Sequence, residues 1–212
     1  MNTSTAPAPA IPRSLFALSV FYGGMVCVAG VLGNKQVALG PLAVEAGIFA
    51  FLLLVVVSSA VAELHGQRVA NSLVRFGFVP LIVSILLAVV VLALPASEKM
   101  EPERANAFAL MMGATWRIWI AGIVAYGVSM TLNVAIFDRL RSGTRLVIVR
   151  GAIASVLSQI VDTLLFVTIA FYGIFPIGAL LGGQMLAKVV LSLLLVPPLI
   201  SGFVALGRRL DR

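Results

Sequence analysis

The chain has 212 residues, of which 61% are hydrophobic and only 11% are charged. Soluble domains of this size do not have that balance, so the composition predicts an integral membrane protein. The formal net charge of +7 does not indicate nucleic-acid binding, because the basic residues lie between apolar segments and do not cluster with aromatic residues on one polar face. With a single cysteine, Cys27, and a single histidine, His65, the sequence excludes an internal disulfide and a multi-thiolate metal site. We expect no metal site and no cofactor.

Six apolar segments predict an all-α protein with six transmembrane helices. Residues 1–13 form a tail rich in Pro and Ala that we expect to be disordered. A transmembrane domain then covers 14–207, and a short basic tail covers 208–212. The predicted spans are residues 15–32, 41–62, 76–94, 118–137, 146–171 and 177–206. The last span is long enough to need a tilt or a kink, and Pro197-Pro198 would provide the kink.

Between the third and fourth spans lies a polar segment, residues 95–104, that is rich in Glu and Lys. The next ten residues, 105–114, are apolar but too few to cross a bilayer. They predict either a helix that lies at the membrane interface or an extension of the fourth span.

The basic residues indicate the orientation of the chain, because cytoplasmic loops of membrane proteins carry an excess of Lys and Arg. One set of alternate loops and both ends of the domain hold most of the arginines: Arg13, Arg68, Arg75, Arg139, Arg141, Arg145, Arg150, Arg208, Arg209 and Arg212. We therefore expect both termini to face the cytoplasm.

Asp162 lies in the middle of the fifth apolar segment. A charge at the centre of a span costs about 2.5–3.5 kcal/mol on insertion scales, so it persists only where it is paired, faces a cavity or has a function. Ser158 and Phe166 each lie four residues from Asp162, and Gln159 lies three residues before it. On a helix these side chains form one polar stripe with an aromatic ring beside it.

Lys188 is a second charged residue deep in the membrane, at a similar depth in the next span. Two interpretations stay open. Asp162 and Lys188 form a structural ion pair that locks their helices together, or one or both face a cavity and bind solute. The polar side chains around Asp162 outnumber what one ion pair needs, which favours the second interpretation.

Other polar residues within the spans allow two readings each. Glu63 ends the second span and either binds solute or pairs with Arg68 at the interface. Ser129 and Asn133 either line the site or form hydrogen bonds between helices.

The sequence shows no sign of an enzyme that acts on lipid. His65 is expected to be solvated, and we find neither a Ser–His pair nor a cluster of acids that could hold a metal. We therefore expect a protein that is not an enzyme.

Several of these residues stand in motifs that resemble those of the queuosine precursor transporter family, also called the vitamin uptake transporter-like family. The most specific stretch is Ser158-Gln159-Ile160-Val161-Asp162-Thr163-Leu164-Leu165-Phe166, which is similar to the family's Ser-Gln-x-x-Asp-Thr-x-x-Phe block. Further matches are Gly33-Asn34-Lys35, Glu63-x-x-Gly66, Arg117-Ile118, Arg150 and Lys188. The chain departs from the family pattern at Ser59 and Asn133, where the family has Asp.

The resemblance implies a bacterial inner-membrane importer of a 7-deazaguanine-type queuosine precursor for tRNA modification. It also implies a six-helix architecture like that of the membrane subunits that bind substrate in energy-coupling-factor importers, and such a subunit for a vitamin or nucleobase is the alternative function. The implied partners are a nucleobase-like small molecule and the lipid bilayer, not nucleic acid, and a homodimer stays open.

A deazapurine ring needs acceptors for its N–H groups, donors for its carbonyl and aromatic faces for stacking. Phe137 and Tyr126 are further candidates for the stacking. The expected substrate-binding residues are Asp162, Gln159, Ser158, Asn133, Ser129, Asn34, Lys188, Glu63, Phe166 and Arg117.

Overall fold

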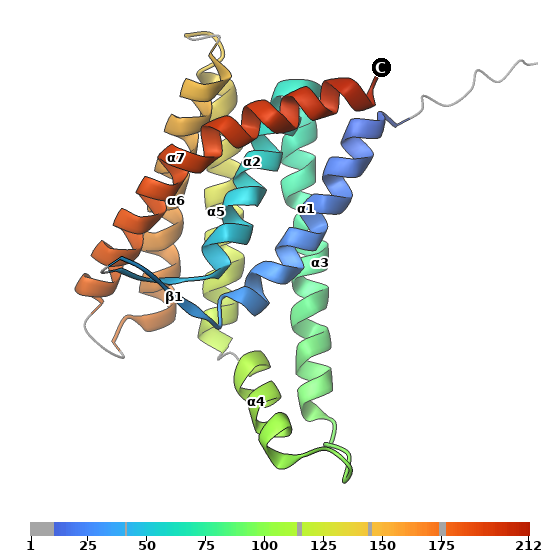
Figure 1. The fold of residues 1–212 in the computed structure, drawn as a ribbon, viewed down its shortest axis with the longest axis vertical. Coiled ribbons are helices and arrows are strands. Elements are labelled where there is room, and N and C mark those ends of the chain that lie inside the picture. The colour runs from blue at the N-terminus through green and yellow to red at the C-terminus, as the bar shows by residue number, and fades with distance from the viewer. Residues whose placement is uncertain (1–10, 41, 114–115, 144–145, 174–176) are drawn as a thin grey trace, which may run out of the picture.

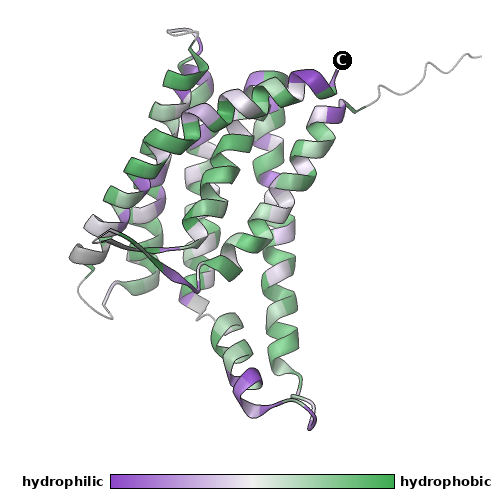
Figure 2. Ribbon diagram, in the orientation of Figure 1, coloured by the Kyte–Doolittle hydropathy of each residue, from purple (hydrophilic) through white to green (hydrophobic). Residues whose placement is uncertain are grey.

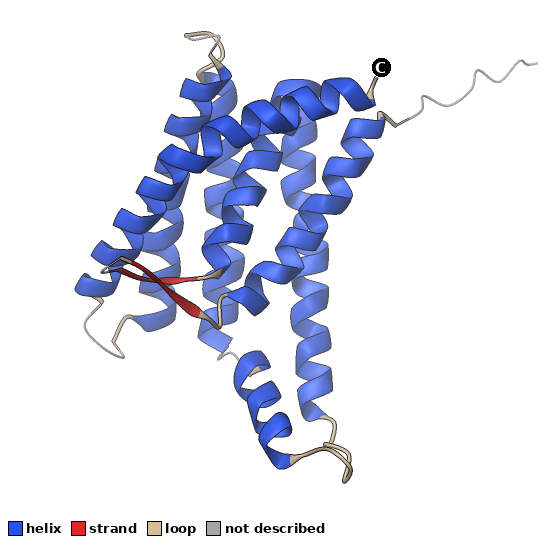
Figure 3. Cartoon of the chain, in the orientation of Figure 1, coloured by secondary structure: helices blue, strands red, loops and turns tan. Residues whose placement is uncertain are grey.

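The structure, a computed structural model, describes residues 11–40, 42–113, 116–143, 146–173 and 177–212. Helices make up nearly all of these residues, and one short hairpin of two strands joins the first two helices (Figures 1 and 3). In chain order the elements are α1 (Arg13–Leu32), β1 (Gln36–Leu39), β2 (Leu42–Glu45), α2 (Gly47–His65), α3 (Gln67–Ala93), α4 (Pro102–Met112), α5 (Trp116–Arg139), α6 (Val147–Phe171) and α7 (Gly178–Leu210). Six of the seven helices, all except α4, are long and apolar enough to cross a membrane, which confirms the expected number of spans.

Apolar residues cover most sides of the long helices (Figure 2), but the helices differ in what those residues contact. The most apolar stretch of α2 is 67% buried, whereas that of α3 is only 6% buried. A helix that is apolar all round belongs either in a core or in lipid. Helix α2 is therefore the core of the bundle, packed against α1, α3, α5 and α7, and α3 exposes side chains such as Val79, Val83 and Leu87 to the lipid.

Helices α5, α6 and α7 pack side by side along one flank of the bundle (Figure 1). Helix α7 contains Pro197 and Pro198 and bends along its length (Figure 1). A proline inside a helix removes one backbone hydrogen bond and clashes with the preceding turn, so the bend has the cause that the sequence predicts.

The prediction that the second span begins at residue 41 is wrong. Strands β1 and β2 pair antiparallel, with Gln36 opposite Glu45, and α2 begins only at Gly47. Gly40, in the turn, has a φ of 61°, a left-handed conformation that glycine adopts without steric cost. Strand pairing satisfies the backbone groups that face each other across the hairpin, so these residues form backbone hydrogen bonds without a helix.

The connection between the second and third spans is shorter than expected. Helix α3 begins at Gln67, directly after Gly66 with its φ of 87°, so Arg68 and Arg75 lie on the helix and not in a loop.

The segment after α3 forms a separate helix, α4, which ends at Met112 before Gly113. Of the two alternatives for residues 105–114, the separate short helix is therefore the one found, and it lies beside the far end of α3 (Figure 1).

The start of α1 and the end of α7 meet at one end of the bundle (Figure 1). The Ser14 amide donates to Asp211 Oδ1 at 2.9 Å, the Ser14 hydroxyl donates to Asp211 Oδ2 at 2.6 Å, and Ser14 Oγ lies 2.8 Å from His65 Nε2. His65 is thus hydrogen-bonded, and the expectation that it is merely solvated is wrong. The arrangement is not that of a catalytic triad, because the Asp211 carboxylate bonds the serine and not the imidazole.

The position of the start of α1 and the end of α7 at one side is what an even number of spans requires. The assignment of that side to the cytoplasm stays a prediction from the arginines. Most of the tail expected at 1–13 and Arg145 lie outside the described residues, while Arg13 already belongs to α1 and residues 208–210 to α7.

Candidate solute-binding site

Asp162 and Lys188 form an ion pair between α6 and α7. Lys188 Nζ lies 2.9 Å from Asp162 Oδ2, and the side chains of Lys188 and Asp162 are only 9% and 8% exposed respectively. The hydroxyl of Ser129, on α5, donates to Asp162 Oδ1 at 3.2 Å. Both carboxylate oxygens therefore have a partner, which offsets part of the cost of a charge inside the bundle.

The same ion pair lines a cavity of about 480 Å³. The cavity lies in the half of the bundle nearest the hairpin, between the second half of α1, the start of α2 and the facing parts of α3, α5, α6 and α7. Its volume falls within the range of about 300–1,000 Å³ that is usual for small-molecule sites. Asp162 and Lys188 therefore pair with each other and also face a cavity. That they bind solute there stays a prediction.

Aromatic rings surround the charged pair in this cavity. The lining includes Phe51, Trp119, Tyr126, Phe166 and Phe171. Lys188 Nζ lies 5.9 Å from the centroid of the Phe51 ring, within the range of a cation–π contact. A few charged groups among apolar and aromatic walls are typical of a site that binds a flat polar molecule.

Glu45, which the sequence analysis did not select, also lines the cavity. It is the last residue of β2, outside the membrane-spanning helices, and it pairs with Gln36 in the hairpin. Burial raises the pKa of its carboxyl, nearby Lys188 lowers that pKa in part, and Asp162 raises it. Glu45 therefore belongs electrostatically to the Asp162–Lys188 group. In the sequence Glu45 falls near the start of the segment predicted as the second span, and only the hairpin brings it to the site.

A model of the protein family described as "Putative vitamin uptake transporter" matches residues 45–202. The chain belongs to this family. No curated protein and no solved structure matches it. The family and the six membrane-crossing helices make the chain a multi-pass membrane transporter of a small molecule and not an enzyme. The match runs from Glu45 to beyond Lys188, so it includes the three charged residues of the cavity.

Two further predicted residues of this vitamin uptake transporter, Asn34 and Phe166, also line the cavity. Asn34 Nδ2 donates to the carbonyl oxygens of Gly30 at 3.2 Å and Val31 at 3.3 Å, which closes the end of α1. The ring of Phe166 contacts Phe171 edge to face, with centroids 6.2 Å apart.

Three predicted residues lie deeper than the cavity, further from the hairpin. Asn133 Nδ2 donates to the hydroxyls of Ser58 and Ser59 on α2, each at 3.1 Å. The Ser158 hydroxyl donates to the carbonyl of Ser155 at 3.0 Å. Both polar atoms of the Gln159 amide are buried without a hydrogen-bond partner among the described residues. An unpartnered buried polar group costs about 1–3 kcal/mol, so this packing is not what stability alone favours.

Glu63 pairs with Arg150 and not with Arg68, so the predicted partner is wrong. Arg150 Nη1 lies 2.7 Å from Glu63 Oε2, its Nε donates to the Phe137 carbonyl at 3.0 Å, and its Cζ stands 4.1 Å from the Phe137 ring centroid. Arg68 lies exposed on α3, whereas Arg150 points into the bundle and is 1% exposed. Arg150 and Asp162 are twelve residues apart on α6, about 18 Å along the helix axis, so Glu63 and Phe137 do not lie at the cavity.

Arg117, the remaining residue of the predicted binding site, caps the end of α6. Its Nε and Nη2 donate to the Ile169 carbonyl at 3.2 and 3.0 Å, and Nη2 donates to the Tyr172 carbonyl at 3.0 Å. The last carbonyls of a helix have no partners within the helix and attract positive charge. Arg117 thus fixes the helix that carries Asp162.

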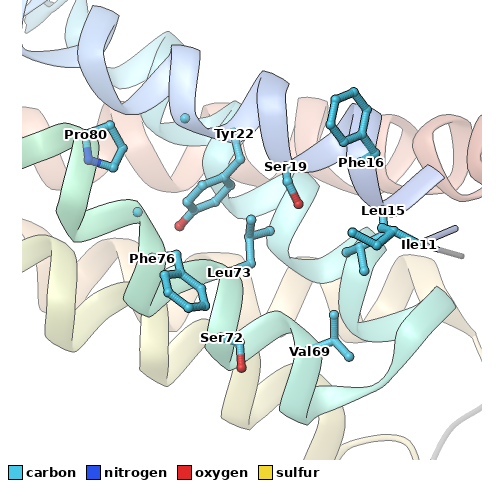
Figure 4. A pocket seen from close by; sticks show the side chains of 12 residues that line it. Ile11, Leu15, Phe16, Ser19, Tyr22, Val69, Ser72, Leu73, Phe76 and Pro80 are labelled. Atoms are coloured by element: carbon cyan, nitrogen blue, oxygen red, sulfur yellow. The ribbon is translucent and has the colours of Figure 1, made fainter. Parts of the chain in front are cut away.

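A second hollow, of about 500 Å³, lies between α1 and α3, and Figure 4 shows its side chains. Its lining is mostly apolar, including Leu73 and Phe76, and contains none of the predicted site residues. Tyr22 faces this hollow and Tyr126 faces the cavity of the ion pair. Their hydroxyls lie 3.0 Å apart, and Tyr126 also donates to the Val74 carbonyl at 2.9 Å. The tyrosine pair is therefore the wall between the two hollows.

Proposed function

We propose that the protein imports a 7-deazaguanine-type queuosine precursor across a bacterial inner membrane and binds it in the cavity of the Asp162–Lys188 pair. One observation carries the proposal: a buried acid and a buried base face a cavity of about 480 Å³ with aromatic walls. Membership of the vitamin uptake transporter family supports transport of a small molecule. The Ser-Gln-x-x-Asp-Thr-x-x-Phe resemblance at residues 158–166 supports the substrate class.

The chemistry of the cavity suits the edge of a guanine-like ring. Such an edge carries a carbonyl acceptor next to N–H donors. Lys188 would donate to the carbonyl, and Asp162, held by Ser129, would accept from the N–H groups. The solute would thereby divide the existing ion pair and give each charge a new partner, which avoids an unpaired buried charge in either state. Phe51 and Phe166 would supply faces for stacking.

Transport then requires that the bound solute reach the opposite side of the bilayer. The cavity lies on the hairpin side of the ion pair. The positions of the arginines favour a cytoplasmic location for the other side. Import would proceed by alternating access, in which the helices rearrange around a site near the bilayer midplane.

Binding is tested first, on purified protein in detergent, by thermal shift with 7-deazaguanine bases and with adenine and uracil as matched controls. A cognate precursor at a hundredfold excess over its dissociation constant stabilises the fold by about 2.7 kcal/mol. We expect this shift for the guanine-edged bases alone. The absence of any shift with 7-deazaguanines, or equal shifts with uracil, would contradict the proposed substrate class.

The alternative is a substrate-binding subunit that works with a separate energising complex. The family description names vitamin uptake, and the printed sequence carries no Walker A motif. Uptake of labelled precursor by cells that lack every coupling ATPase supports the independent importer. Loss of uptake in those cells, together with co-purification of an ATPase complex, supports the alternative.

A further inference from the structure

Beyond the ion pair, on the side away from the hairpin, several buried polar side chains carry atoms that lack a hydrogen-bond partner among the described residues. Ser155 and Gln159 on α6, Asn133 on α5 and Ser192 on α7 are all 0% exposed. The unpartnered atoms are both polar atoms of the Gln159 amide, Asn133 Oδ1, Ser155 Oγ and Ser192 Oγ. We call these four residues the buried polar column.

The register of the helices places the column between the cavity and the Arg150–Glu63 ion pair. Helix α7 begins next to β2 and runs antiparallel to α6 (Figure 1), and the Lys188–Asp162 contact fixes their relative height. Ser192 is therefore one turn beyond the ion pair, and Gln159 and Ser155 are one and two turns beyond it on α6. Arg150 lies more than one turn beyond Ser155 on α6, at the far end of the column.

A purely structural interface between helices does not account for these groups. Buried polar atoms in folded proteins nearly always have partners, and polar side chains between transmembrane helices normally bond across the interface. Asn133 does so with one end, through Ser58 and Ser59, but its carbonyl oxygen is left over. The side chains of the column suit a conformation in which water or solute contacts them.

The Arg150–Glu63 ion pair closes the far end of the column. Arg150 joins three helices, because it contacts Glu63 on α2, the Phe137 carbonyl on α5 and its own helix, α6. The guanidinium also covers the Phe137 ring. A cross-link of this kind holds the helices together, and its opening would separate α2 and α5 from α6.

We propose that the buried polar column is the second half of the solute route, closed in this structure, and that the Arg150–Glu63 ion pair is its gate. This inference rests on the proposed transport function, but it concerns the path and not the identity of the solute. It predicts that the column becomes accessible to water from the Arg150 side when the ion pair is removed.

The test measures thiol accessibility, which needs no substrate. Ser192→Cys and Ser155→Cys are made separately in a Cys27→Ala background, because Cys27 lines the cavity and would react from the hairpin side. A hydrated thiol ionises and reacts with a charged, membrane-impermeant methanethiosulfonate, whereas a thiol in dry apolar packing does not. Membrane vesicles of each sidedness receive the reagent on one face at a time.

With the ion pair intact, we expect slow labelling of both cysteines. Glu63→Gln removes one charge of the ion pair while it keeps the size of the side chain. The open conformation should become more populated, so the rate of labelling from the Arg150 face should rise by about tenfold or more. Labelling from the hairpin face should not rise. Arg141→Gln is the matched control, since Arg141 is an exposed arginine at the same end of the bundle, and it should leave both rates unchanged.

The double variant Glu63→Gln/Arg150→Gln guards against misfolding, because it leaves no unpaired buried charge. It should label as fast as Glu63→Gln. The gate would be overturned if both gate variants label slowly in protein that elutes as a single folded species. Fast labelling with the ion pair intact would show that the column is not closed. Failure of 7-deazaguanine binding with a positive labelling result would reject the substrate and keep the route.

Discussion

Lys188 on α7 and Asp162 on α6 approach to 2.9 Å although 26 residues separate them in the sequence, and they face one cavity. Each charge makes the other tolerable in the membrane, so neither can be removed alone without leaving an uncompensated partner. Since the Ser129 hydroxyl holds the second carboxylate oxygen, the pair is already oriented before any solute arrives. Pre-organised charges in a cavity favour binding, because little ordering is needed when the solute enters.

Asp162→Asn should reduce uptake of labelled precursor by about 10–100-fold, because a hydrogen bond to a charged group contributes about 1.5–3 kcal/mol. The variant keeps the shape of the side chain but leaves Lys188 without its counter-charge. The measurement is initial uptake rate in cells, corrected for the amount of protein in the membrane fraction. Asp138→Asn is the matched control, since it makes the same change at a residue of α5 that does not line the cavity. Unchanged uptake in Asp162→Asn would remove Asp162 from the site.

Glu45→Gln should change how stability depends on pH. Burial raises the pKa of Glu45 above the ordinary value of 4.5, so the folded protein holds this proton more tightly than the unfolded chain. Stability should therefore fall as the pH rises from about 4.5 through the raised pKa, because the unfolded chain loses the proton first. Glu45→Gln should lack this loss. Thermal unfolding of both proteins between pH 4 and pH 8 gives the comparison, and parallel pH profiles would contradict the prediction.

The fold was predictable from the sequence to the extent that hydrophobicity determines it. Six apolar segments of sufficient length specify six helices, because a bilayer leaves the backbone few alternatives. The hairpin at residues 36–45 was missed, since its residues are as apolar as a helix of the same length and only the turn at Gly40 separates the two. The early start of α3 was missed because the first residues of this helix are partly polar and resemble a loop in the sequence.

The site was predictable where a charge stands in an apolar segment. Asp162 and Lys188 were found because buried charges are costly, and their similar depth made an ion pair one of the two interpretations. The sequence did not predict the roles of Glu45 and Arg150, because Glu45 fell within a predicted span and Arg150 was counted among the arginines of the loops. Glu45 reaches the cavity only through the hairpin, and the partner of Glu63 depends on which face of α6 turns inward. Spacing within one helix does not determine such contacts between helices.

Gly77→Ala should destabilise the protein by about 1–3 kcal/mol, the usual cost of overpacking. A Cβ at Gly77 would clash with the Tyr126 hydroxyl and approach Tyr22 Cε1 to 2.8 Å. It would therefore break the hydrogen-bonded tyrosine pair that forms the wall between the two hollows. Gly24→Ala is the matched control on α1, where an added Cβ meets nothing within 4 Å. Chemical or thermal unfolding in detergent measures both, and equal stability of the two variants would show that the wall can rearrange freely.

Asp211→Asn should loosen the contact between the two ends of the transmembrane domain. Hydrogen bonds from the hydroxyl and the amide of Ser14, with a smaller contribution from nearby His65, lower the pKa of Asp211 below 3.8. A carboxyl whose pKa is lower in the folded protein stabilises the fold above its unfolded pKa, and this stabilisation is lost as the pH falls through the folded pKa. Near neutral pH we therefore expect Asp211→Asn to lower the melting temperature.

Ser14→Ala removes the serine hydroxyl from the same contact and should act in the same direction, and the double variant should add little to either single change, because the two residues share one interaction. Glu98→Gln, at an exposed acid in the loop after α3, is the control for the loss of a surface charge. If Asp211→Asn and Glu98→Gln melt at the same temperature at pH 7, the Ser14–Asp211 contact contributes nothing measurable. If Asp211→Asn alone melts earlier at pH 7 but the difference vanishes below the folded pKa, the ionised carboxylate is the form that joins α1 to α7.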